Sequence, residues 1–340
     1  MSTSSLKSEL IVLDSPGNAH LKMVAKRYTS GDESNAQGLT LLLAHSIGAQ
    51  KEHWEPTLEK LFASQADKPP QQRVREAYSF DWQSHGDSAV LNEKYLLEQP
   101  DGIAVKEWGR AIASFIADSD RVRGHRLILV GHSVGSFATL YAADGLESRL
   151  TGIILIESPM IDRKAYRKLL THIEGAHTAM KRMTLARRDD WPNTGAAIAW
   201  LQKRMPYNTW DERILQTIAR DGFHTLPKGT VTTKTPKQQE AAAFKLAADA
   251  STDGWEIAEA VGLKVPVHKI YGSVVDLMPR YTTDGMVDRE PKPYVASTVE
   301  IADRGHLIVQ QDPDVIASEI SKILDGLPPS STRSTPSCRL

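Results

Sequence analysis

The sequence contains very little cysteine, the residue from which disulfide frameworks and thiolate metal sites are built. Its 340 residues include one cysteine, Cys338, which is third from the C-terminal end. A single cysteine excludes an internal disulfide framework and any Cys-based metal site. The eleven histidines are scattered and do not show the paired spacing of a zinc site. We therefore expect no metal and no other cofactor, and a reducing intracellular setting.

Long apolar runs and an excess of one charge sign are also absent. No run reaches the roughly 18 apolar residues that a membrane span needs, and the opening segment MSTSSLKSEL lacks the basic and apolar regions of a secretory signal. The formal net charge is −1, so the composition indicates neither nucleic acid nor an anionic membrane as a partner. We expect a soluble protein that acts on a small molecule.

The apolar residues that are present alternate between strand-like runs and helical patterns. Two opening strands are predicted at 9–13 and 21–28, as an antiparallel edge. Further strands are predicted at 39–46, 74–81, 125–131, 150–158, 264–273 and 296–303, with helices at 51–62, 103–117 and 312–324 between or after them. This order predicts an α/β fold with a mostly parallel, doubly wound sheet, whose reactive groups lie at the carboxyl ends of the strands.

The alternation breaks between about 160 and 255, where the chain is expected to contain only helices. Thr235, Pro236 and Gln238 match the N-cap, first-turn proline and capping-box positions of one of them. We therefore predict a core formed by 1–158 and 256–325 and a helical cap at 159–255, inserted after the strand that ends at Glu157. The Pro/Ser/Thr-rich residues 326–340 are expected to form a flexible tail.

The segment Gly131-His132-Ser133-Val134-Gly135 lies between a predicted strand and a predicted helix that ends at Gly145. Such a turn exposes its central serine as a nucleophile, and its strained backbone requires small residues two positions away on either side. Gly131 and Gly135 meet that requirement. The alternative is an ordinary turn with an incidental serine.

A serine hydroxyl needs a base, an acid that orients the base, and donors for the oxyanion. His306, in the loop after the last predicted strand, is the candidate base, although a lone loop histidine is often only a solvated surface group. For the oxyanion hole we select the backbone N–H groups of Val134 and Ile47. Ile47 lies two positions after His45, in a loop where Ser46 occupies a position at which glycine is more usual.

The order of these motifs resembles the α/β-hydrolase fold superfamily over residues 20–325. The segment FDWQSHGDS at 80–88 is similar to the D-x-x-G-H-G-x-S loop of that superfamily, with slightly longer spacing. The segment LLLAHSIGAQKEHWEP and the C-terminal Cys338-Arg339-Leu340 look like those of fungal peroxisomal acyl-CoA hydrolases of secondary metabolism, such as that of mycophenolic acid biosynthesis. This closer resemblance implies a serine-dependent thioesterase or esterase with a hydrophobic acyl group under the cap.

Two carboxylates are candidates for the acid. In most of the superfamily the acid follows the strand after the cap, often as G-x-x-D, but here Asp276 comes one residue late. Glu157 ends the strand that comes after the helix following Ser133, 24 residues beyond Ser133, where the resemblance to the mycophenolic-type hydrolase places the acid. A carboxylate at the end of a buried run also needs a partner. We favour Glu157, with Asp276 as the alternative acid. Either carboxylate could instead cap a loop or pair with Arg163 or Arg280.

The tripeptide Cys338-Arg339-Leu340 resembles the small-basic-leucine address for peroxisomal import. It predicts binding to a peroxisomal import receptor and a peroxisomal location, with a cytoplasmic location as the alternative. The predicted activity is hydrolysis of an acyl thioester or carboxylic ester through an acyl-enzyme. Cleavage of a carbon–carbon bond, acyl transfer to another acceptor, and a non-catalytic ligand-binding role on the same fold remain open.

Overall fold

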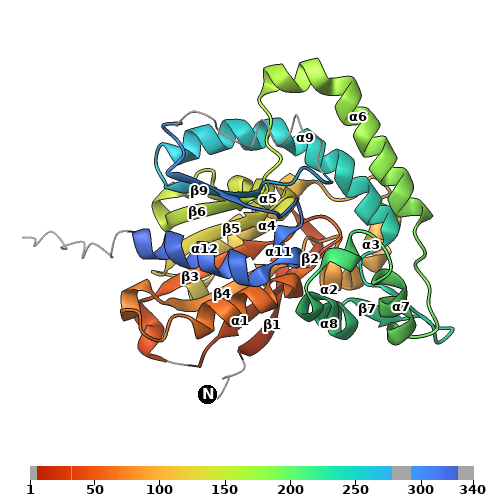
Figure 1. The fold of residues 1–340 in the computed structure, drawn as a ribbon, viewed down its shortest axis with the longest axis horizontal. Coiled ribbons are helices and arrows are strands. Elements are labelled where there is room, and N and C mark those ends of the chain that lie inside the picture. The colour runs from red at the N-terminus through yellow and green to blue at the C-terminus, as the bar shows by residue number, and fades with distance from the viewer. Residues whose placement is uncertain (1–5, 32, 278–291, 328–340) are drawn as a thin grey trace, which may run out of the picture.

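The computed structural model describes residues 6–31, 33–277 and 292–327 (Figure 1). Eight strands form the main sheet: β1 (Lys7–Ser15), β2 (Asn18–Thr29), β3 (Leu39–Ala44), β4 (Val74–Phe80), β5 (Arg126–His132), β6 (Leu150–Ile156), β9 (Val267–Gly272) and β10 (Ser297–Ile301). Their order in the sheet is β1-β2-β4-β3-β5-β6-β9-β10. The two pairings of β2 are antiparallel and the other five pairings are parallel. This confirms the predicted mostly parallel sheet.

Helices cover both faces of this sheet, which explains the unbroken apolar runs of its central strands. The long core helices are α1 (Glu55–Ala63), α4 (Val105–Asp118), α5 (Val134–Ala143), α9 (Lys237–Gly262) and α12 (Pro313–Gly326). Successive residues of β3 point to opposite faces. Leu42 packs in the cluster formed with α4, α5 and α9, whereas Leu41 and Leu43 pack in the cluster formed with α1 and α12.

The shorter helical elements lie mostly in the loops that connect these layers. They are η1 (Glu33–Gln37), η2 (Lys51–Trp54), η3 (Pro70–Gln72), α2 (Gly86–Leu91), α3 (Glu93–Leu97), η4 (Asp120–Val122), η5 (Glu147–Arg149), η6 (Tyr207–Thr209) and α11 (Ile308–Gln311). Two of them bear on the site: η2 follows the loop after β3, and α11 follows the loop that carries His306.

Between β6 and α9 the chain leaves the sheet. It forms α6 (Arg163–Ala186), α7 (Thr194–Leu201), α8 (Glu212–Asp221) and a hairpin of β7 (Phe223–Thr225) and β8 (Val231–Thr233). Each of the three helices begins after an Asp or Asn whose side chain accepts a hydrogen bond from a first-turn N–H. The expectation of helices only was wrong for the hairpin. Strands of three residues are too short to show the alternation from which strands are predicted.

The start of α9 differs from the prediction. The N-cap residue is Pro236, with no side-chain cap hydrogen bond, whereas the Thr235 hydroxyl accepts a hydrogen bond from the backbone N–H of Gly86 at 3.0 Å. Thr235 therefore connects the segment before α9 to the core and does not cap the helix. Helix α9 also continues without a break past residue 255, so the predicted cap–core boundary lies inside one helix. The division into core and cap stays a prediction.

Candidate active site

Ser133 occupies a tight turn between β5 and α5. Its backbone has φ 54° and ψ −121°, a positive φ that is costly for a residue with a side chain. A Cβ on Gly131 would lie 2.5 Å from Ser136 Cα, and one on Gly135 would collide with the carbonyl oxygen of Ala44. Both contacts are with backbone atoms, which cannot move aside easily. Close packing of the turn therefore explains the predicted requirement for small residues on either side of Ser133, which Gly131 and Gly135 meet.

His306 lies in the loop between β10 and α11, and the fold places its ring beside Ser133. The distance from His306 Nε2 to Ser133 Oγ is 2.9 Å. Both residues are buried, with 7% of His306 and 6% of Ser133 exposed. The alternative of a solvated surface histidine was therefore wrong. The structure brings the predicted base within hydrogen-bond distance of the predicted nucleophile.

Glu157 directly follows β6, and its carboxylate reaches the other side of the imidazole. Its Oε2 lies 3.1 Å from His306 Nδ1, and its Oε1 accepts a hydrogen bond from the backbone N–H of Gly272. The residue is buried and has φ 50°, so its backbone is strained in the same sense as that of Ser133. Ser133, His306 and Glu157 therefore form one continuous line of contacts.

Asp276, the alternative acid, contacts the same histidine at a different atom. Its Oδ1 accepts a hydrogen bond from the backbone N–H of His306 at 3.0 Å. Its carboxylate also lies against Gly305, where any Cβ would collide with it. Asp276 is exposed, whereas Glu157 is buried. The Nδ1 atom of the His306 ring faces Glu157 and not Asp276. Arg163 pairs with Glu256 and does not pair with either candidate, and Arg280 lies outside the described residues.

His132 holds the opposite side of the His306 backbone, a contact that the sequence did not indicate. Its Nε2 lies 2.9 Å from the carbonyl oxygen of His306, to which it donates. Burial, assisted by the nearby His306, lowers the pKa of His132 to about 3. The ring is therefore neutral at pH 7 and can serve as a fixed donor. Its position inside the G-x-S-x-G segment was the only available sequence signal.

The two residues predicted for the oxyanion hole lie in adjacent segments. Val134 is the first residue of α5, where backbone N–H groups have no partner within the helix. Ile47 belongs to the loop after β3, and this loop packs directly on Gly135, whose Cβ would approach the carbonyl oxygen of His45 to 2.7 Å. The roles of Ile47 and Val134 as oxyanion donors stay predictions.

His45 braces that loop from beneath. Its Nδ1 lies 2.8 Å from the carbonyl oxygen of Ser46, and its Nε2 accepts a hydrogen bond from the backbone N–H of Trp82 at 3.2 Å. Burial lowers the pKa of His45 to about 4, which matches a neutral ring with one donor and one acceptor nitrogen. The hydrogen bond from Trp82 therefore ties this loop to the segment that follows β4.

A buried ion-pair cluster lies under the same loop and was missed by the sequence analysis. Lys51 Nζ lies 2.9 Å from Glu52, 3.0 Å from Asp81 and 2.6 Å from Asp87. Burial alone would lower the pKa of Lys51, but these carboxylates raise it overall. Asp81 belongs to the segment FDWQSHGDS and also accepts the backbone N–H of Asp87. The segment FDWQSHGDS was the sequence signal from which this ion-pair cluster could have been predicted.

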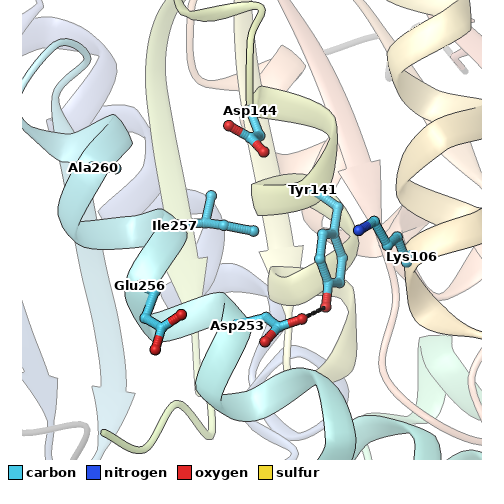
Figure 2. A pocket seen from close by; sticks show the side chains of 7 residues that line it. All are labelled: Lys106, Tyr141, Asp144, Asp253, Glu256, Ile257 and Ala260. Carbon is cyan, nitrogen blue, oxygen red and sulfur yellow. Dashed lines mark hydrogen bonds between the residues drawn. The ribbon is translucent and has the colours of Figure 1, made fainter. Parts of the chain in front are cut away.

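A surface pocket between α4, α5 and α9 is separate from this site (Figure 2). Its lining residues are Lys106, Tyr141, Asp144, Asp253, Glu256, Ile257 and Ala260. None of these is among the residues that contact His306, and the Tyr141 hydroxyl donates to Asp253 at 3.0 Å. Among the described residues, no group of three His, Cys, Asp or Glu side chains could hold a metal ion.

Comparison with known proteins gives a consistent picture. The model of the Alpha/beta hydrolase family matches residues 41–319. A curated relative, the peroxisomal membrane protein LPX1 of Saccharomyces cerevisiae, is 32% identical over 150 residues, which cover 43% of this chain and 38% of that protein. The matched region therefore spans well under half of the curated relative.

Solved structures share the fold at low sequence identity. The peroxisomal alpha-beta-hydrolase Lpx1 of Saccharomyces cerevisiae has a TM-score of 0.72 at 19% identity, covering 98% of this chain and 93% of that chain. E-2-(acetamidomethylene)succinate hydrolase has a TM-score of 0.66 at 16% identity, covering 94% and 100%. The thioesterase domain from the curacin biosynthetic pathway has a TM-score of 0.57 at 17% identity, covering 92% and 99%. At these identities the likeness shows the fold alone.

Proposed function

This chain belongs to the Alpha/beta hydrolase family, and from that premise we propose that it is a serine hydrolase that cleaves acyl thioesters or carboxylic esters through an acyl-enzyme. Family membership supports hydrolase activity in general. The single observation that carries the serine mechanism is the line of contacts from Ser133 Oγ through His306 to Glu157, at 2.9 Å and 3.1 Å. These are the separations at which a base can take a proton and an acid can orient the base.

In the first half-reaction, Ser133 Oγ attacks the acyl carbonyl carbon while His306 Nε2 takes the hydroxyl proton. Glu157 stabilises the resulting imidazolium through Nδ1–H. The backbone N–H groups of Ile47 and Val134 donate to the oxyanion. When the tetrahedral intermediate collapses, the bond from carbonyl carbon to leaving sulfur or oxygen breaks, and the leaving group receives the proton from His306.

In the second half-reaction, a water molecule gives a proton to His306 Nε2 and attacks the acyl-enzyme carbonyl carbon. The same oxyanion donors act again, the ester bond to Ser133 breaks, and His306 returns the proton to Ser133 Oγ. The products are a carboxylic acid and a thiol or alcohol. No cofactor or metal takes part in these steps.

We assign the two acidic residues different roles. Glu157 is the triad acid, because its carboxylate faces the ring nitrogen of His306. Asp276 is a positioning residue, because it accepts the backbone N–H of His306 and does not contact the ring. His132 donates to the carbonyl oxygen of the same residue. The peptide groups on both sides of the His306 Cα are therefore anchored, which limits rotation of the loop that presents the imidazole.

We place the enzyme in the peroxisome and propose a hydrophobic acyl group as its substrate. The yeast relative is named as a peroxisomal protein, and one fold neighbour is named as a thioesterase domain. The predicted import signal, Cys338-Arg339-Leu340, lies outside the described residues. An acyl-CoA thioester is the first substrate to test, because the sequence resemblance indicates it.

A fluorophosphonate probe tests the nucleophile without knowledge of the substrate. We expect the folded protein to be labelled on Ser133, the Ser133→Ala variant to remain unlabelled, and Ser318→Ala, an exposed control on α12, to be labelled like the parent. Hydrolysis of a panel of acyl-CoA thioesters and p-nitrophenyl esters of two to twelve carbons then identifies the acyl preference. If Ser133→Ala turns over the panel at the parental rate, the serine mechanism is refuted.

A further inference from the structure

Helix α6 has an uneven charge distribution that the whole-chain balance conceals. It carries six Lys or Arg residues and one acidic residue, Glu174, whereas the complete chain has a formal net charge of −1. Helix α6 therefore has a local net charge of +5, and the remainder of the chain is net acidic. A molecule of this kind is attracted to a negatively charged surface through one face and repelled through the others.

The structure leaves this charge free to act outward. Five of the basic side chains are exposed and have no ion-pair partner within residues 6–31, 33–277 and 292–327: Lys164, Arg167, Lys168, Lys181 and Arg182. The sixth, Arg163, pairs with Glu256. Helix α6 packs on α9 through its opposite side, which includes the buried Ile173, and lies along the periphery of the molecule (Figure 1).

The spacing of these residues suits a flat surface. Lys164 and Arg182 are about five helical turns apart and so project in the same direction, with roughly 27 Å between them along the axis. The outward side between them carries the small residues Thr171, Gly175 and Thr178, which let the helix backbone approach closely. The distance between Lys164 and Arg182 is too large for one phosphate group or one small anion to contact both side chains.

Exposed apolar side chains distinguish a lipid surface from other polyanions. Leu170 and Leu185 are exposed, and Met183 is 66% exposed. In contact with a bilayer these side chains can enter the headgroup region and lose their water contact. Against a nucleic acid backbone they would have no comparable partner, and no aromatic residue stands on the outward side to stack on bases.

We propose that the outward face of α6 (Lys164, Arg167, Lys168, Arg182 and Leu185, flanked by Lys181, Leu170 and Met183) is a peripheral docking surface for an anionic lipid bilayer. The contact is electrostatic, with shallow insertion of the apolar side chains. It does not span the bilayer, and no described helix is long and apolar enough to do so. The inference is independent of the hydrolase proposal, because it rests on the exposed side of α6 alone.

Vesicle sedimentation of the full chain tests this proposal. We expect at least hundredfold tighter binding to phosphatidylcholine vesicles containing 30% phosphatidylserine than to phosphatidylcholine alone, weakening as salt is raised. The Lys164→Glu/Arg182→Glu double variant should lose about 25-fold or more, at roughly fivefold per basic residue. A matched double variant with the same change in net charge, Lys60→Glu/Lys94→Glu, changes exposed lysines outside α6 and should lose less than threefold.

A second pair of measurements separates lipid from other polyanions. Leu185→Ser should weaken vesicle binding by threefold or more and leave binding to a DNA duplex unchanged. Circular dichroism confirms that each variant is folded, and no step requires enzyme activity. Equal binding to both vesicle types, equal losses in the two double variants, or a preference for the duplex that Leu185→Ser does not alter would each overturn the proposal.

Discussion

Replacing Glu157 with glutamine tests the proposed acid most directly, because the substitution keeps the shape of the side chain and removes its charge. In the structure one carboxylate oxygen accepts the Gly272 N–H and the other faces His306 Nδ1. A glutamine must keep its single carbonyl oxygen on Gly272 to satisfy that donor. Its NH₂ group then points at Nδ1, which is forced to become an acceptor.

The consequence is the wrong imidazole tautomer. When Nδ1 accepts a hydrogen bond, the single proton of the neutral ring lies on Nε2. A protonated Nε2 can no longer accept the proton of Ser133. In serine proteases the equivalent change lowers kcat about 10⁴-fold. We expect a loss of about 10³- to 10⁴-fold in kcat, which corresponds to roughly 4–5.5 kcal/mol of transition-state stabilisation, with a much smaller change in KM.

The matched control is Asp276→Asn, which removes one negative charge near the same histidine. The asparagine carbonyl oxygen can still accept the backbone N–H of His306, so we expect kcat within about tenfold of the parent. Asp276→Ala, which removes that acceptor, should cost more than Asp276→Asn. The assay is steady-state hydrolysis of the best ester or thioester from the panel. A Glu157→Gln variant within tenfold of the parent, beside an Asp276→Asn variant that loses a thousandfold, would reverse our assignment.

Three further predictions concern stability. Gly135→Ala should prevent folding or cost several kcal/mol, because its Cβ collides with backbone atoms, whereas Gly175→Ala, which meets nothing within 4 Å on α6, should raise the melting temperature slightly. Lys51→Met should lower the free energy of unfolding in urea by about 3–5 kcal/mol, since it leaves buried carboxylates without their cation. The control Lys60→Met, at an exposed lysine, should lower it by under about 0.5 kcal/mol. Equal losses in the two variants would contradict the reasoning from the buried ion pairs. Burial lowers the pKa of His53 from 6.5 to about 3. Between these two pH values the unfolded chain binds a proton at His53 that the folded chain does not bind. The contribution of neutral, buried His53 to the free energy of unfolding is therefore fully present above pH 6.5 and is lost as the pH falls toward 3. His53→Gln should therefore reduce the slope of unfolding free energy against pH between about 4 and 6 by roughly 1.4 kcal/mol per pH unit; an unchanged slope would show that this histidine is protonated in the fold.

The parts of the fold that could be predicted are those with local causes. The central strands were found because burial on both faces demands continuous apolar runs, as in the wholly buried β3. The Ser133 turn was found because close backbone packing admits only glycine at Gly131 and Gly135. The hairpin of β7 and β8 was missed, because three-residue strands carry no periodic signal, and Thr235 was misread because its hydroxyl satisfies a donor 149 residues away.

The site could be predicted as a set of residue types in order, but its contacts could not. The sequence indicated a histidine after the last strand and two carboxylates near it. Which carboxylate contacts the His306 ring depends on where the paired strands β6 and β9 end relative to each other, and on the positive φ of Glu157. The anchoring of the His306 backbone by His132 and Asp276 joins the end of β5 to the loops that follow β9 and β10, and no local sequence pattern records such a contact.

Net charge shows the same division between sequence and structure. A sum over the chain, −1, argued against an anionic surface as a partner, because a sum is blind to position. Periodicity by itself predicted the doubly wound sheet, and the G-x-S-x-G motif predicted the turn at Ser133, since burial and backbone sterics act on neighbouring residues. Only the tertiary structure decided that Glu157 faces the His306 ring and that the basic residues of α6 lie free on its outer side, because contacts between distant segments exist only once the chain has folded.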